Sequence, residues 1–310
     1  MNERAIDVVH VGSASRDLTD DDPRGWRLGG GASYSALTTA RLGLRTAAVI
    51  GVDPAAAVAS ELDLLREAGV ELVLAALPEA PVFRNRETPA GRIQACLASG
   101  KPLAVPGIPA AWRAAVAWSL VPVAGELDAS WASVVPTGAF LAIGWQGWLR
   151  TLVAGQDVRR RAPMASSVLD RADLVGVSLH DLEPGTPAAG LLRFLRPGAQ
   201  LVVTDGSAGG RLLRLGSDGG VVARRYAALA PEQEVDATGA GDVFLAALLC
   251  SMVWPDGPGR AEGRGPQPDL RFAAAAASYV VEAPGLYGVP SRDAVVERLA
   301  NGGGTGLPPG

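Results

Sequence analysis

The residues best suited to chemistry lie in the stretch 235–249. Gly239, Ala240 and Gly241 allow a tight backbone turn, and the apolar run after Asp242 has the length and composition of a buried helix. We therefore expect these small residues at a helix N-terminus, where free N–H groups and the helix dipole can hold an anion such as a phosphate. A carboxylate beside an anion site is best explained if a neutral hydroxyl lies between them and passes its proton to Asp242 as it attacks phosphorus.

Asp242 has a simpler interpretation as an acidic first-turn residue that favours a helix N-terminus, with upstream glycines that make a turn. The whole string 236–242, Asp-Ala-Thr-Gly-Ala-Gly-Asp, favours the catalytic interpretation. It resembles the C-terminal signature of the ribokinase-like (PfkB) family of sugar and nucleoside kinases, from which only Ala237 departs. The resemblance implies that Asp242 is the catalytic base and that the Gly-Ala-Gly before it forms the anion hole.

A glycine triplet supplies the second match to this family. Residues 29–31 open a helix of small residues that runs to Leu-Gly at 42–43, as in the family's N-terminal signature, although Tyr34 stands where many members have asparagine. Asp17 follows the expected strand 6–11 on its exit loop, where an Asp is commonly a turn former. In the family an Asp at this place binds sugar hydroxyls, and a carboxylate suits this role because each oxygen can accept two hydrogen bonds. The acceptor contacts implied are Asp17, Gly29 and Gly30.

Residues 81–97 predict two strands around a short loop. Ribokinase-like proteins place a lid here, and a lid that excludes water prevents loss of the phosphoryl group to hydrolysis. Arg84, Asn85 and Gln94 are candidate substrate contacts, although an exposed polar hairpin explains them equally well. The resemblance implies a lid built from segments near 13–30 and 79–104, through which two copies could pair as a homodimer.

An aromatic and polar cluster follows the expected strand 137–143. Ligands bind at the carboxyl ends of strands in open α/β sheets, so Gln146 and Arg150 are candidate substrate contacts, whereas Trp145 is either a core residue or a ligand platform. The string Gln-Gly-Trp-Leu-Arg, with Val-Ala-Gly-Glu at 123–126, resembles a subgroup that includes plant inositol kinases and bacterial relatives.

The donor side is expected after two later strands. The strand 173–179 leads into Ser-Leu-His-Asp, where most of the family has Asn-x-x-Glu. The resemblance implies that the acid that arranges magnesium waters is Asp181, or Glu183 in another register. The alternative is that this segment is only a turn with acidic residues. Residues 204–210 resemble the family's nucleotide-side loop. The ATP contacts implied are Ser178, Asp181, Thr204, Gly206, Gly209, Thr238, Ser278 and Gly285, with Mg²⁺ on Asp181 through water and a monovalent cation such as K⁺ on Asp236.

Composition limits the other possibilities. A net charge of −4 argues against a nucleic-acid surface, and Lys101, the only lysine, lies in Gly-Lys-Pro, which is not a Walker A loop. Two cysteines and two histidines are too few for a disulfide framework or a His-rich metal site. The sequence contains no pattern of a signal peptide or membrane span, so we expect a cytoplasmic protein without a membrane partner.

Strands that alternate with helices predict one α/β domain over 1–303, with a flexible tail at 304–310. Its expected architecture is three-layered and ribokinase-like, with a mostly parallel central sheet, helices on both faces and a small β lid. The predicted function is an ATP-dependent kinase that acts on a hydroxyl of a small sugar or an inositol-like polyol. The alternatives are a nucleoside kinase, with a base stacked on Trp145 or Phe83, and a catalytically silent sugar-binding regulator. A dehydrogenase is disfavoured because no Gly-x-Gly-x-x-Gly follows the first strand.

Overall fold

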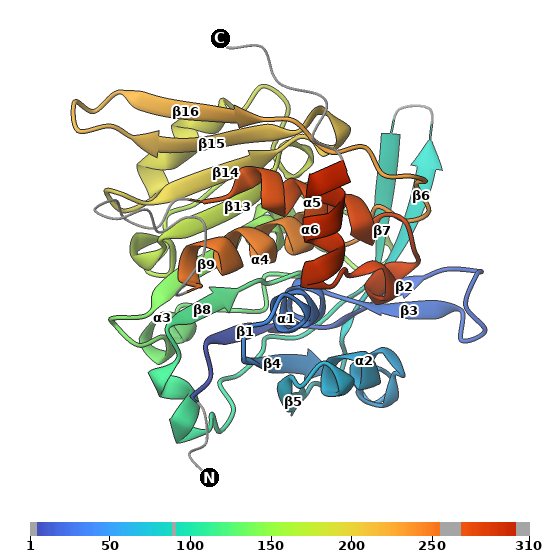
Figure 1. Cartoon of the computed structure of the whole chain (residues 1–310). Helices are drawn as coiled ribbons and strands as arrows, with labels where there is room; N and C mark the ends of the chain where they lie inside the picture. The colour runs from blue at the N-terminus through green and yellow to red at the C-terminus, as the bar shows by residue number, and fades with distance from the viewer. Residues whose placement is uncertain (1–4, 89–90, 255–267, 302–310) are drawn as a thin grey trace.

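The computed structural model describes residues 5–88, 91–254 and 268–301. A nine-stranded sheet crosses the molecule with helices on both faces (Figure 1), which confirms the expected three-layer α/β architecture. Its strand order is β16-β15-β14-β13-β9-β8-β1-β4-β5. The strands in chain order are β1 (Val8–Ser13), β4 (Thr46–Val52), β5 (Glu71–Ala76), β8 (Ala117–Leu120), β9 (Phe140–Gly144), β13 (Leu174–Ser178), β14 (Gln200–Thr204), β15 (Gly210–Leu215) and β16 (Val221–Tyr226).

In this sheet, all neighbouring strands pair in parallel along the order β14-β13-β9-β8-β1-β4-β5. The strands β15 and β16 add an antiparallel edge. The parallel strands read as near-continuous apolar runs because both faces are covered: every residue of β1 and β4 is buried. β1 has β4 on one side and β8 on the other: the chain first adds β4 and β5 on one side of β1 and later adds β8, β9, β13 and β14 on the other. The carboxyl ends of β1 and β8 therefore form a topological switch point, where open α/β sheets bind ligands.

Five helices pack on one face of the sheet, where they share an apolar cluster built around α1 and α4. They are α1 (Gly31–Arg41), α2 (Glu61–Glu67), α4 (Ala240–Val253), α5 (Leu270–Val280) and α6 (Arg292–Asn301). The opposite face carries α3 (Ser130–Val134) and several 3₁₀ helices over a second apolar cluster that contains Trp112, Trp118, Trp131 and Trp145. None of the helices in the described ranges is long and apolar enough to cross a membrane.

A second, five-stranded sheet projects from the main body, in the order β11-β7-β6-β2-β3. Its strands are β2 (Ser15–Leu18), β3 (Trp26–Gly29), β6 (Pro81–Thr88), β7 (Gly91–Ser99) and β11 (Gln156–Asp157). The hairpin expected at 81–97 is present, although residues 89–90 of its turn lie outside the described part, as does the expected tail at 304–310. The expectation of an exit loop at Asp17 was wrong, because this segment pairs as a strand with both β3 and β6.

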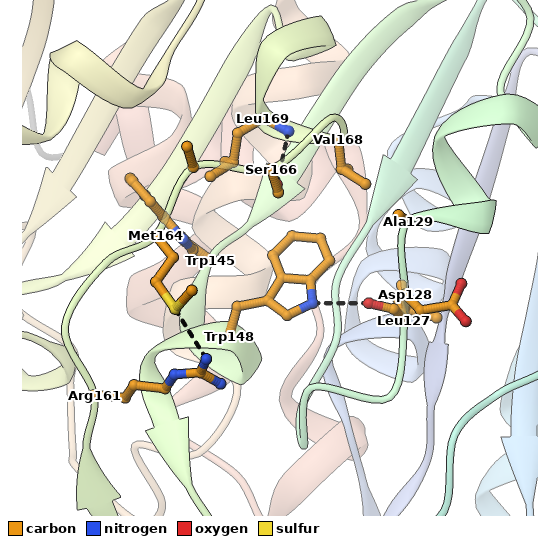
Figure 2. Close-up of a pocket in the computed structure, with 11 residues that line it drawn as sticks. Leu127, Asp128, Ala129, Trp145, Trp148, Arg161, Met164, Ser166, Val168 and Leu169 are labelled. Atoms are coloured by element: carbon orange, nitrogen blue, oxygen red, sulfur yellow. Dashed lines mark hydrogen bonds between the residues drawn. The ribbon is translucent and has the colours of Figure 1, made fainter.

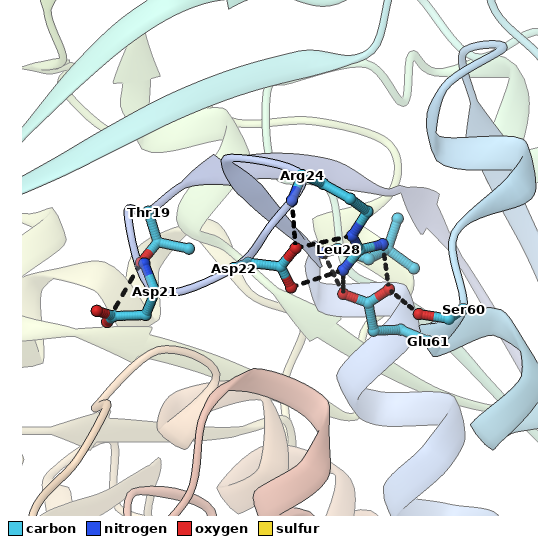
Figure 3. A network of polar contacts seen from close by, with 7 residues as sticks. All are labelled: Thr19, Asp21, Asp22, Arg24, Leu28, Ser60 and Glu61. Carbon is cyan, nitrogen blue, oxygen red and sulfur yellow. Dashed lines mark hydrogen bonds and ion pairs between the residues drawn. The ribbon is translucent and has the colours of Figure 1, made fainter.

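A buried carboxylate fastens the turn between β2 and β3 to α2 (Figure 3). Glu61, on α2, is only 1% exposed and accepts two hydrogen bonds from Arg24, at 2.8 and 2.7 Å, and one from the Leu28 N–H at 2.9 Å. Burial opposes the charge on Glu61, but the hydrogen bonds from Arg24 and Leu28 lower the pKa of its carboxyl below the ordinary value. The end of this sheet that carries Asp17 and Gly29 is thus held firmly against the main domain.

Candidate active site

The stretch predicted to do chemistry forms the start of α4. Gly239 is the residue that precedes the helix, with φ +82°, a left-handed conformation that strains any residue with a Cβ. The ring of Tyr34, from α1, lies so close to Gly239 that a Cβ there would overlap it. Both the backbone conformation and the lack of space therefore require glycine. Gly241 borders open space, so the helix N-terminus is accessible to a ligand.

Asp242 lies at the switch point of the main sheet. A Cβ built on Gly31, the first residue of α1, would be 2.9 Å from Asp242 Oδ1 and 3.0 Å from the Cβ of Val121, which follows β8. Asp242 thus sits where the start of α1, the start of α4 and the end of β8 come together. The sheet topology indicates the same region as the binding crevice.

The surroundings of Asp242 suit a general base. Burial raises the pKa of its carboxyl to about 7; the positive charge of Arg150 opposes this shift, and the negative charges of Asp181 and Asp17 add to it. A base whose pKa lies near neutrality can both accept a proton from a substrate and be substantially ionised at pH 7.

Asp17 lies close enough to Asp242 for its charge to act on that carboxyl. A Cβ on Gly29 would overlap the Asp17 carboxylate, so glycine at 29 makes room for this side chain, and the Ser15 hydroxyl donates a 3.0 Å hydrogen bond to Asp17 Oδ1. The pKa of Tyr34 is raised by burial and further by the charges of Asp17, Asp236 and Asp242. The charges of three carboxylates thus act on the buried phenol, and because its ring lies against Gly239, Tyr34 forms part of the wall of this site.

The acid expected to arrange magnesium is paired with the two expected substrate contacts. Asp181 Oδ1 accepts a hydrogen bond from Gln146 Nε2 at 3.2 Å and lies 3.5 Å from a guanidinium nitrogen of Arg150. Within the described ranges, no three His, Cys, Asp or Glu side chains are grouped closely enough to hold a metal ion. The residues present therefore do not form a metal cage of their own.

The donor-side residues divide into two groups. Ser178 and Thr204 are register partners at the carboxyl ends of β13 and β14, so the structure brings them together, and Gly206 and Gly209 lie in the turn that follows β14. The Ser178 hydroxyl accepts a hydrogen bond from the His180 N–H at 3.2 Å.

Ser278 and Gly285 lie elsewhere. Arg298, from α6, donates a 2.7 Å hydrogen bond to the Ser278 hydroxyl, which itself donates to the Ala275 carbonyl, so the structure uses Ser278 to join α5 to α6. A Cβ on Gly285 would lie 3.6 Å from the Tyr34 hydroxyl oxygen, which places Gly285 on the side of the site where Asp17 and Asp242 lie.

The proposed monovalent-cation residue, Asp236, has backbone partners. Its Oδ1 accepts a hydrogen bond from the Thr238 N–H at 2.9 Å, and its Oδ2 lies 3.4 Å from the Gly285 nitrogen. These contacts connect the loop before α4 to the segment after α5. The cation itself stays a prediction.

The nucleoside-kinase alternative required Trp145 or Phe83 to stack on a base, and the structure buries both side chains. Trp145 and Phe83 are each 1% exposed, and Trp145 packs edge-on against Phe194 with ring centroids 5.9 Å apart. Trp145 and Trp148 instead border a cavity of about 200 Å³, together with Arg161 and Met164 (Figure 2). Trp145 belongs to the apolar cluster on the face opposite α1 and α4, so it is a core residue.

The polar lid residues contact each other. Gln94 Nε2 donates a 3.0 Å hydrogen bond to Asn85 Oδ1 across the β6–β7 hairpin, and both side chains are half-buried, whereas Arg84 is exposed. Their role as substrate contacts stays a prediction.

Sequence reasoning missed the importance of Glu126. This carboxylate is 4% exposed and accepts hydrogen bonds from the backbone N–H groups of Ser13, Val123 and Ala124, at 2.8, 3.1 and 2.8 Å. It thereby joins the end of β1 to the loop after β8, directly behind the switch point. In the sequence, Glu126 stands out only as the last residue of the Val-Ala-Gly-Glu string that resembles the inositol-kinase subgroup.

Comparisons with known proteins agree with this geometry. Residues 156–292 match the family model described as pfkB family carbohydrate kinase. This match covers less than half of the chain, so it shows that residues 156–292 are similar to that family. No curated sequence matches the chain closely enough to count as a relative.

Similar solved structures cover almost the whole chain. A pyrophosphate-dependent kinase of the ribokinase family, complexed with a pyrophosphate analog and myo-inositol, is 20% identical, with a TM-score of 0.67 over 94% of this chain and 99% of that one. Arabidopsis thaliana ribokinase complexed with ribose and ATP is 23% identical, with a TM-score of 0.66 over 96% and 99%. Methanocaldococcus jannaschii nucleoside kinase is 18% identical, with a TM-score of 0.66 over 96% and 99%. At these identities the likeness shows that the chain has the ribokinase fold.

Proposed function

We propose that this protein is a PfkB-family kinase, which transfers a phosphoryl group to a hydroxyl of a small sugar or polyol such as an inositol. The observation that carries the proposal is the position of Asp242, which lies in the first turn of α4, beside Gly31 and within the electrostatic reach of Asp17. A pKa near 7 makes this carboxylate a suitable acceptor for the hydroxyl proton.

The proposed reaction assigns one role to each part of the site. Asp17 orients the acceptor, whose hydroxyl oxygen attacks the terminal phosphorus of the donor as Asp242 takes the hydroxyl proton. The bond between phosphorus and the bridging oxygen breaks, and the leaving phosphate group keeps the electron pair. The N–H groups of Gly239, Ala240 and Gly241 stabilise negative charge on the phosphoryl oxygens. Closure of the β6–β7 hairpin excludes water from the reaction.

ATP is the first proposed donor, because Ser178 and Thr204 lie together beside the turn that carries Gly206 and Gly209. Pyrophosphate is the second. The hydroxyl of Ser278, expected to line the nucleotide pocket, is already hydrogen-bonded to Arg298, and one similar structure is a pyrophosphate-dependent kinase. A donor without a base needs no nucleoside pocket, so this observation favours testing it directly.

A panel of acceptors and donors tests the proposed function. The purified protein is incubated with myo-inositol, ribose or a nucleoside, each with ATP or pyrophosphate, and the phosphorylated product is measured. We expect product with a sugar or polyol and its loss in Asp242→Asn. Transfer only to nucleosides would identify a nucleoside kinase. If no combination gave product while sugar binding persisted, the chain would instead be a silent sugar-binding protein.

A further inference from the structure

Arg150 is a cation held inside the crevice by loose contacts. It follows the 3₁₀ helix Gln146–Leu149 after β9, and its side chain is only 12% exposed. Its contact with Asp181 Oδ1 is 3.5 Å, at the outer limit of a hydrogen bond, and Gln146 donates to the same oxygen at the shorter distance of 3.2 Å. Within the described part of the chain, this long contact is the one side-chain hydrogen bond of Arg150, and because a guanidinium has five N–H donors, donors remain for a ligand.

The charged groups that act on Asp242 come from several elements. Asp17 on β2 and Asp181 in the 3₁₀ helix Leu179–Asp181 are negative, whereas Arg150 is positive. Tyr34 on α1 is a neutral phenol on the same side. Of the groups in the described chain whose charge reaches Asp242, Arg150 is therefore the one cation.

Phosphoryl transfer requires positive charge near the moving group. The N-terminus of α4 supplies only a partial charge, equivalent to about half an elementary charge. The single lysine of the chain, Lys101, is exposed in the segment after β7, whereas the side chain of Arg150 is only 12% exposed. A planar guanidinium can make two parallel hydrogen bonds to phosphate oxygens, which suits Arg150 for this task.

We propose that Arg150 binds the transferred phosphoryl group directly, exchanging its loose contact with Asp181 for the phosphoryl oxygens when the donor enters. This inference rests on the proposed phosphotransferase function and adds a catalytic residue to it. Asp181 then acts as the resting partner of Arg150, and Gln146 keeps that carboxylate in place after the exchange. The alternative is that Arg150 only neutralises Asp181 and acts through it.

Variants at Arg150 test the inference. We expect Arg150→Met to lower kcat about 10²- to 10³-fold with the acceptor KM changed less than threefold, and Arg150→Lys to recover part of the loss. The matched control is Arg160→Met, because Arg160 is exposed and donates to the His180 carbonyl one residue from Asp181. This control should keep kcat within twofold of the wild type. A kcat within threefold of wild type in Arg150→Met would overturn the inference.

The Asp181→Asn background separates the direct role from the indirect one. If Arg150 contacts the phosphoryl group, Arg150→Met still lowers kcat at least tenfold in that background. If it acts only through Asp181, the second substitution adds less than threefold and the inference is wrong.

Donor binding supplies a readout that does not depend on turnover. Calorimetric titration of wild type and Arg150→Met with ATP and with pyrophosphate should show at least tenfold weaker binding of one of these donors in the variant. Equal binding of both donors by the two proteins, or binding of neither by the wild type, would contradict a direct contact. A wild type that binds a donor through Arg150 but phosphorylates no acceptor would refute the proposed function and leave this contact intact.

Discussion

Asp242→Asn should abolish phosphoryl transfer and at the same time stabilise the folded protein above neutral pH. The folded state raises the pKa of Asp242 from 3.8 to about 7, so between these pH values the folded chain keeps a proton that the unfolded chain has lost. The free energy of unfolding therefore falls as pH rises from about 4 to about 7, and the loss is complete above pH 7.

The size of this effect follows from the shift. A difference of about 3 pKa units corresponds to about 4 kcal/mol, at about 1.36 kcal/mol per unit. The side chain is half-buried, and solvent screening reduces the figure to about 2–4 kcal/mol. Asparagine has nearly the same shape and no charge, so the variant avoids this loss.

Urea denaturation followed by tryptophan fluorescence measures the difference, because the chain contains seven tryptophans. We expect Asp242→Asn to unfold at higher urea than the wild type at pH 8, with the difference shrinking towards zero near pH 4. The matched control is Asp53→Asn. Asp53 is 4% exposed and accepts hydrogen bonds from Arg16 and from the Ala56 N–H, so this substitution should lower stability at pH 8. An Asp242→Asn variant no more stable than wild type at pH 8, or stabilised equally at every pH, would refute the reasoning.

Three further predictions concern the same site. The logarithm of kcat/KM should rise with pH and level off near pH 7 as Asp242 ionises; a flat profile between pH 5 and 8 would exclude it as the base. Gly239→Ala should lower the free energy of unfolding, measured by urea denaturation, by about 1–3 kcal/mol and slow turnover at least tenfold, because Gly239 has a φ of +82° and a Cβ there would overlap the Tyr34 ring. Wild-type turnover in this variant would show that the helix N-terminus tolerates a Cβ. Glu126→Ala should lower the free energy of unfolding by about 3–5 kcal/mol, since three backbone N–H groups lose their acceptor; a loss below 1 kcal/mol would mean that water replaces the carboxylate.

Much of the fold could be predicted because it depends on local patterns. Buried strands read as apolar runs, and their alternation with helices predicts a mostly parallel sheet. Asp17 is the instructive exception. Its segment is short and polar, so a loop was the natural expectation, but pairing with β6, more than 60 residues later in the chain, makes it a strand.

The helix N-terminus around Gly239 and Asp242 was evident from adjacent residues, because the requirement for glycine at a turn and for a carboxylate in the first helical turn depends on a few neighbouring positions. Which side chains meet there depended on the tertiary structure. Arg150 and Asp181 are 31 residues apart in the chain and come together only because β9 and β13 are adjacent in the sheet. The same packing buries Trp145 in the core and engages Ser278 with Arg298, which no local pattern encodes. A contact between distant segments depends on strand order and on how whole elements pack, and these are decided by the burial of the entire apolar surface.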